Sequence, residues 1–234
     1  MQGYAREVVI DNFLAGGSAY LIQLLYRIPV MVIALTIHEF SHAFIAYKLG
    51  DDTAKSRGRL TLNPLKHLDP IGAIMLIVAR VGWAKPVPVN VLNFKDPKQD
   101  MVKVGLAGPM SNLILSFLTA FPLYFLFYTN YTTGLGGVGS VLYTFLGLLF
   151  EINLFLAVFN LIPVPPLDGS RIFYGILPEK FYFGVMKYER YVAMGLFALI
   201  IIKPSWLFTV MNTVTTPFRF AFLKAAEFVV GLFI

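Results

Sequence analysis

Long apolar runs separated by short polar stretches dominate this chain. The first run lies between Phe13 and Leu49, and from Ile28 to Tyr47 its only ionisable side chains are His38, Glu39 and His42. That stretch of 20 residues is long enough to cross a hydrocarbon core of about 30 Å. The pattern therefore predicts a transmembrane helix that carries ionisable groups inside it.

A second apolar region, Val104 to Phe150, contains no charged residue over 47 positions. A run of this length must cross the membrane twice, and the glycine-rich stretch Thr132 to Gly139 predicts the turn between the two crossings. The second crossing is expected to continue past Glu151 to about Leu161.

Shorter apolar runs add to this count. Ile71 to Val81 has about eleven residues, which is too few to span, so we expect it to be re-entrant or buried against other helices. Tyr191 to Ile202 and Leu207 to Phe218 are separated by Lys203 and Pro204, and form either one bent helix or two short ones. We therefore predict an all-α polytopic membrane protein with five or six transmembrane helices.

Two polar stretches after the first helix favour extended structure. Gly58 to Pro64 predicts a short strand that ends in a turn, and Trp83 to Asn90 predicts a second piece whose prolines suit a sheet edge. We expect a small membrane-surface β-sheet between the first core helices. Its edge could pair with an extended substrate, or the sheet could be complete in itself.

Neither an internal repeat nor a soluble segment divides the chain. We therefore expect a single transmembrane domain over residues 1–234, with a core at about 28–178 and C-terminal helices at about 188–234.

Composition agrees with a membrane protein. Hydrophobic residues make up 57% of the chain and charged residues 14%, compared with roughly 25% charged residues in soluble domains. The net charge of +6 is interpreted as a signal of membrane topology, that is, of which loops face the cytoplasm. No basic patch is long enough to bind nucleic acid, so we expect no nucleic-acid partner. Ten Lys and Arg lie between Lys48 and Lys103, whereas the loop around Thr132 to Ser140 has none. We expect a protein of the prokaryotic inner membrane whose site faces the cytoplasm.

The candidate chemistry lies in His38-Glu39-Phe40-Ser41-His42, an H-E-x-x-H motif. Residues four apart on a helix lie on one face, so His38 and His42 can hold one zinc ion. Glu39 can then act as general base toward a zinc-bound water. The alternative is a pair of histidines that only bond across a helix bundle, but ionisable groups at membrane depth are costly and usually functional.

A catalytic zinc needs a third protein ligand, and the chain has no cysteine. Asp168 is the best placed, because it follows an apolar helix and is flanked by Pro166 and by Gly169, which tolerates an unusual backbone angle. An ordinary Asp-Gly turn is the competing interpretation. The third histidine, His67, could compete as ligand, although a structural turn histidine bonded to carbonyls is the favoured interpretation.

Several motifs together make the chain recognisable. H-E-F-S-H in a transmembrane helix, Gly108-Pro109-Met110-Ser111-Asn112, and Asn160 to Gly169 (N-L-I-P-V-P-P-L-D-G) resemble the site-2 protease family of intramembrane zinc metalloproteases. The resemblance also covers Leu62 to Gly72. Within that family, the sequence is similar to the compact branch that lacks a PDZ or CBS domain. It implies that Asp168 is the third zinc ligand, with one Zn²⁺ per chain.

Two asparagines are candidates for a substrate or oxyanion role. The amides of Asn160 and Asn112 could hydrogen-bond a substrate backbone, or they could serve only as interhelical hydrogen bonds. Asn153 and Glu151 give weaker signals of the same kind, and Glu151 would mark either a water-filled cavity or a helix near the interface.

The predicted activity is hydrolysis of peptide bonds in or near transmembrane segments of membrane proteins. The expected partners are a transmembrane protein or peptide substrate and the lipid bilayer, and any accessory membrane protein would come from another chain. The alternatives are a membrane metal-ion transporter and a non-catalytic protein that binds transmembrane helices.

Overall fold

The structure, a computed structural model, describes residues 18–78, 82–134, 136–176 and 188–233. Residues 1–17, 79–81, 135, 177–187 and 234 lie outside these ranges, and so does the end of the apolar run predicted from Ile71 to Val81. The elements are helical throughout: α2 (Ser18–Lys48), α3 (Thr53–Ser56), η2 (Pro64–Lys66), α4 (Pro70–Val78), η3 (Val91–Asn93), α5 (Pro97–Thr133), α6 (Gly137–Asn160), α7 (Asp168–Ile176), α9 (Glu189–Ile202) and α10 (Pro204–Val230).

Three described helices are long and apolar enough to cross a membrane: Ile22–Lys48, Pro97–Asn130 and Gly137–Asn160. The α9–α10 pair adds at most a fourth, because its two halves meet at an angle of 96°. Pro204 begins α10 and has no amide hydrogen with which to continue α9. The described part of the chain thus offers three or four spans, and our prediction of five or six is not supported there.

The predicted β-sheet is also wrong for the described residues, which contain no strand. A single antiparallel bridge joins Leu68 to Ala84. Residues 60–62 form bends before η2, and Pro86 and Pro88 lack the amide donors that a ladder needs. Trp83 to Asn90 therefore crosses the protein as irregular backbone, and we call it the crossing segment.

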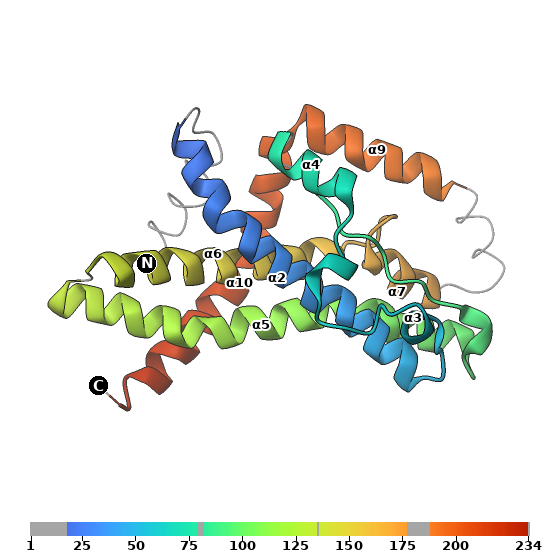
Figure 1. Cartoon of the computed structure of the whole chain (residues 1–234), viewed down its shortest axis with the longest axis horizontal. Helices are drawn as coiled ribbons and strands as arrows, with labels where there is room; N and C mark the ends of the chain where they lie inside the picture. Colours follow the sequence, from blue (N-terminus) through green and yellow to red (C-terminus); the bar gives the residue numbers. More distant parts are fainter. Residues whose placement is uncertain (1–17, 79–81, 135, 177–187, 234) are drawn as a thin grey trace.

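Helix α5 is the centre of the bundle and packs against α2, α6, α7 and α10. It starts where the Asp96 side chain accepts the amide hydrogen of Gln99, with Pro97 at the first position, and it ends at Gly134, whose φ of 72° suits glycine. Figure 1 shows α5 and α6 side by side, with the turn between them at one end of the bundle and α3 and α7 toward the other. This arrangement brings the middle of α2 against α5 and the start of α7.

Candidate metal and catalytic site

Helix α2 presents His38 and His42 from inside a predicted span. The two imidazoles lie one turn apart, with ring centroids 4.6 Å apart. His42 lies six positions before the helix end at Lys48 and His38 ten positions before it, which corresponds to depths of about 9 and 15 Å. Both side chains are buried. The pair therefore sits within the apolar length of α2, close to one of its ends.

Asp168 reaches the same point from the first position of α7. Its Oδ2 lies 3.0 Å from His38 Nε2 and 3.2 Å from His42 Nε2. The two Nε2 atoms are 3.1 Å apart. Tetrahedral zinc with ligand bonds of about 2.0–2.2 Å places its ligand atoms about 3.3 Å apart. Three buried ligand atoms thus converge at the spacing that one small cation requires.

The other ring nitrogens show how the two histidines are oriented. His42 Nδ1 lies 2.7 Å from the Val104 carbonyl oxygen, which can only accept, so Nδ1 carries the proton. His38 Nδ1 is bonded to Asn112 Oδ1 at 2.6 Å in the same way. In the neutral rings both Nε2 atoms then direct lone pairs at each other and at the Asp168 carboxylate. A divalent ion satisfies all three, and the donor set suits zinc.

Glu39 lies beside the ligand pair, and the crossing segment holds its carboxylate. The amide of Val87 donates to Glu39 Oε2 at 2.9 Å, and both residues are buried. Arg59 Nη2 donates to the Lys85 carbonyl, and Lys85 N donates to the His67 carbonyl at 2.8 Å. A backbone group thus orients the predicted base. Sequence analysis missed Val87, since a backbone amide leaves no residue-type signal.

Asp51 fastens the far end of the crossing segment outside the predicted spans. Burial by itself raises the pKa of the Asp51 carboxyl, but hydrogen bonds from Thr53, the Asn90 amide and the Asn93 side chain outweigh it and hold the pKa below its usual range. The Asn90 amide donates to Asp51 Oδ2 at 2.8 Å. The end of α2 and the residues before α5 are therefore tied to one carboxylate.

Two glycines allow the backbone to approach the site closely. A Cβ on Gly108 would lie within 2.6 Å of His38 Nε2 and still closer to His42 Nε2. A Cβ on Gly169 would overlap the Leu161 carbonyl oxygen. We expected Gly169 to supply an unusual backbone angle. Its requirement is steric, however, because the positive-φ glycines among the described residues are Gly50, Gly58 and Gly134.

The two candidate asparagines lie in different places. Asn112 is fully buried behind His38, where its amide nitrogen donates to Asn153 Oδ1 at 2.7 Å and to the Ala34 carbonyl at 3.2 Å. Asn160 is the last residue of α6, is half-buried, and donates to the Leu156 carbonyl of its own helix at 3.0 Å. The structure brings Asn112 to the back of a ligand and Asn160 to the turn that leads to Asp168.

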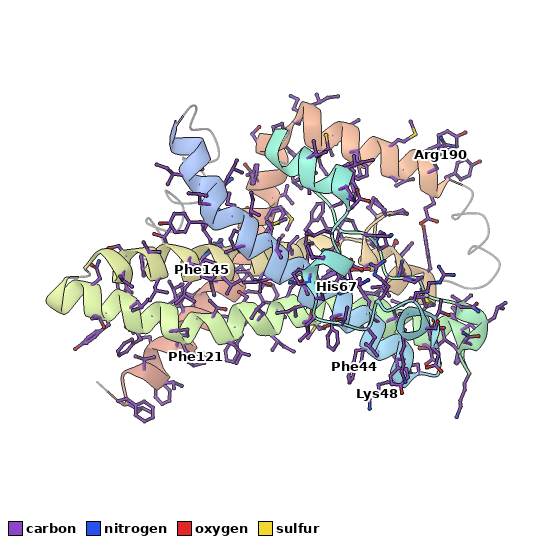
Figure 2. The ribbon with its side chains drawn as sticks, viewed as in Figure 1. Phe44, Lys48, His67, Phe121, Phe145 and Arg190 are labelled. Carbon is purple, nitrogen blue, oxygen red and sulfur yellow. The ribbon has the colours of Figure 1, made fainter. Side chains whose placement is uncertain are left out.

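His67 forms the hydrogen bond to a nearby carbonyl that we expected of a structural turn histidine. Its Nε2 lies 2.7 Å from the Thr61 carbonyl oxygen, and the described metal-ligand cluster does not include it. Figure 2 shows His67 on the connection between α2 and α4, with Phe44 and Lys48 farther along α2. Glu151 forms an ion pair with Arg219 on α10.

Comparisons with known proteins agree with this geometry. The model of peptidase family M50 matches residues 26–202. A Bacillus subtilis protein, "Putative zinc metalloprotease YwhC", is 48% identical over 153 residues, which cover 65% of this chain and 69% of that protein. The Mycolicibacterium smegmatis protein "Putative zinc metalloprotease Rip2" is 36% identical over 150 residues, covering 59% of this chain and 52% of its own. The Methanocaldococcus jannaschii "Zinc metalloprotease MJ0392" is 27% identical over 164 residues, covering 70% and 37%. No solved structure matches the chain significantly.

Proposed function

Because the chain belongs to peptidase family M50, and is thereby a zinc metalloprotease of the site-2 type, we propose that it hydrolyses peptide bonds in or beside transmembrane segments of other membrane proteins. The observation that carries this proposal is the position of the ligand cluster. His38 and His42 lie inside the span Ile22–Lys48, so a scissile bond must come to membrane depth to meet them.

We assign one zinc ion per chain to His38, His42 and Asp168. Bound there, zinc supplies Lewis-acid polarisation of the attacking water and of the scissile carbonyl. The two Nδ1–H bonds keep both Nε2 lone pairs directed at the ion. Burial of all three ligands removes competing water and strengthens their hold.

Glu39 is the proposed general base. Its carboxylate takes a proton from the attacking water as the new C–O bond forms, and passes a proton to the amine as the C–N bond breaks. The Val87 amide holds one carboxylate oxygen, which leaves the other for the water. A helical substrate must unwind locally before this step, because its carbonyls are held in i to i−4 hydrogen bonds.

The orientation we propose places the ligand cluster toward the cytoplasm of a prokaryotic inner membrane. Ten Lys and Arg lie between Lys48 and Lys103, on the side of α2 to which His38 and His42 are close. Water would then reach the site from that side. We assign a substrate-contact role to Asn160 because it lies beside the turn that leads to Asp168.

The experiment is proteolysis by the purified full chain in detergent against a panel of single-span substrates. Glu39→Gln is expected to lower the rate by at least about 100-fold, since positioned proton transfer contributes typically 10²–10⁴-fold, while stoichiometric zinc is retained. Removing zinc with a chelator should abolish cleavage, and adding zinc back should restore it.

The matched control is Glu227→Gln. Glu227 is an exposed acid on α10 that pairs only with Lys224 in the described contacts, so its variant should cleave like the wild type. Full cleavage by Glu39→Gln would overturn the assignment of the base. A wild-type chain without bound zinc would overturn the proposed function itself.

A further inference from the structure

A continuous line of side-chain amides runs from His38 away from the ligand cluster into the bundle. Asn112 on α5 bonds His38 Nδ1 at 2.6 Å, and Asn153 on α6 bonds Asn112 at 2.7 Å. Asn153 Nδ2 in turn lies 2.7 Å from the Leu149 carbonyl oxygen. Both asparagines are 0% exposed, so water cannot replace any of these bonds.

The direction of every bond in this line follows from its far end. The Leu149 carbonyl can only accept, so Asn153 must turn its NH₂ group toward it and its Oδ1 toward Asn112. Asn112 must then present its own NH₂ group to Asn153, and its Oδ1 faces His38. His38 therefore carries its proton on Nδ1, and its Nε2 keeps the lone pair that a metal needs.

A second acceptor, at a longer distance from Asn112 Nδ2, favours the same orientation of the Asn112 amide. The Ala34 carbonyl lies 3.2 Å from Asn112 Nδ2, compared with 2.7 Å for Asn153 Oδ1. A flip of the Asn112 amide would set its Oδ1 against both acceptors and its NH₂ against His38 Nδ1–H. The bond to Asn153 is the shorter of the two that oppose this flip.

We propose that Asn153 is a positioning residue for the metal site, which acts through Asn112 to hold His38 in its ligating tautomer. This inference rests on the proposed function only for the identity of the metal. It also gives Asn112 a role of its own, where the sequence left a substrate contact and an interhelical hydrogen bond as alternatives. Outer partners of metal-bound histidines typically change metal affinity by 10–100-fold when they are removed.

The test is zinc affinity of the full chain in detergent, measured by competition with a chromophoric chelator, so it needs no protease assay. Asn153→Ala is expected to weaken zinc binding about 10-fold, at the low end of the range for outer partners because Asn153 acts through a second residue. Asn153→Asp is fully buried and therefore neutral, so its O–H donates to the Leu149 carbonyl while its other oxygen accepts from Asn112. It is expected to bind zinc like the wild type. It also serves as the reporter if Asn153→Ala fails to fold.

Ser116→Ala is the matched control. Ser116 is on α5 and 0% exposed, and its hydroxyl donates to the Phe150 carbonyl of α6 at 2.9 Å. The Ser116→Ala variant therefore loses a buried hydrogen bond across the same α5–α6 interface, and this bond does not involve His38. Its zinc affinity should equal that of the wild type even if its thermal stability falls.

A double-mutant cycle separates orientation from packing. In an Asn112→Asp background the carboxylate accepts from His38 Nδ1 with either oxygen and cannot be flipped wrongly, so adding Asn153→Ala should cost no further zinc affinity. Three results would overturn the inference alone: unchanged affinity in Asn153→Ala, an equal loss in Ser116→Ala, or the same loss in the Asn112→Asp background. A wild-type chain that binds no zinc would overturn the proposed function as well.

Discussion

At Gly108 the missing side chain sets how closely α5 can approach the ligand pair. A Cβ at this position would lie 2.6 Å from His38 Nε2 and still closer to His42 Nε2. The same face of α5 supplies the Val104 carbonyl to His42 and the Asn112 amide to His38. One helix face thus provides both the space and the hydrogen bonds that orient the ligands.

Gly108→Ala is expected to weaken zinc binding by more than about 10-fold, because the histidines must move away from the positions their partners hold. The helix itself gains from the change, since alanine in a helix interior is favoured over glycine by about 0.5–1 kcal/mol. Chelator competition and thermal unfolding measured together would show lost affinity in a folded protein.

The control for this prediction is Gly195→Ala on α9, where a new Cβ would meet nothing within 4 Å. It should leave zinc affinity unchanged. Equal affinity in both variants would mean that α5 can retreat from the site at no cost.

At the scale of the elements, one buried ion pair attaches α10 to the core. Arg219 donates to both carboxylate oxygens of Glu151 on α6, at 2.7 and 2.8 Å. The side chains are 15% and 9% exposed. A charge left alone in such surroundings is far more costly than the pair, so the two residues depend on each other.

Arg219→Met is expected to lower the free energy of unfolding by about 3–5 kcal/mol, because Glu151 is then left buried without its partner. The double variant Glu151→Leu/Arg219→Met should be more stable than Arg219→Met, since no unpaired charge remains. Unfolding in mixed detergent micelles measures both values.

Lys224→Met provides the comparison, because Lys224 forms an exposed pair with Glu227 at 2.7 Å. Its loss should cost less than about 1 kcal/mol. A similar small effect for Arg219→Met would show that α10 is not held by the buried pair.

At the scale of the whole molecule, the distribution of charge and the bundle agree on an orientation. The turn between α5 and α6 lies at one end of the bundle, and α3 and α7 lie toward the other (Figure 1). Lys48 ends α2, Lys55 lies in α3 and Arg57 directly follows α3, whereas Thr132 to Ser140 has no Lys or Arg. The proposed cytoplasmic site follows from this asymmetry.

Single cysteines test this orientation against a clean background, since the chain has no cysteine of its own. Arg57 and Ser140 are both exposed, so a cysteine at either position can react. In right-side-out membrane vesicles an impermeant maleimide should label Ser140→Cys and spare Arg57→Cys, and inside-out vesicles should reverse the result. Labelling of Arg57→Cys from the outer side would place the ligand cluster at the opposite face.

The sequence alone determined the features that depend on local periodicity. Four-residue spacing on a helix brings His38 and His42 together wherever that helix packs, and an uncharged run of 47 residues required the two helices α5 and α6. Tertiary structure decided what joins distant parts of the chain. Asp168 meets the histidines because α7 packs on α5, and Glu39 meets a Val87 amide that no residue type announces. The expected sheet did not form in the described residues because the crossing segment bonds to side chains and turns, and its prolines offer no ladder donors.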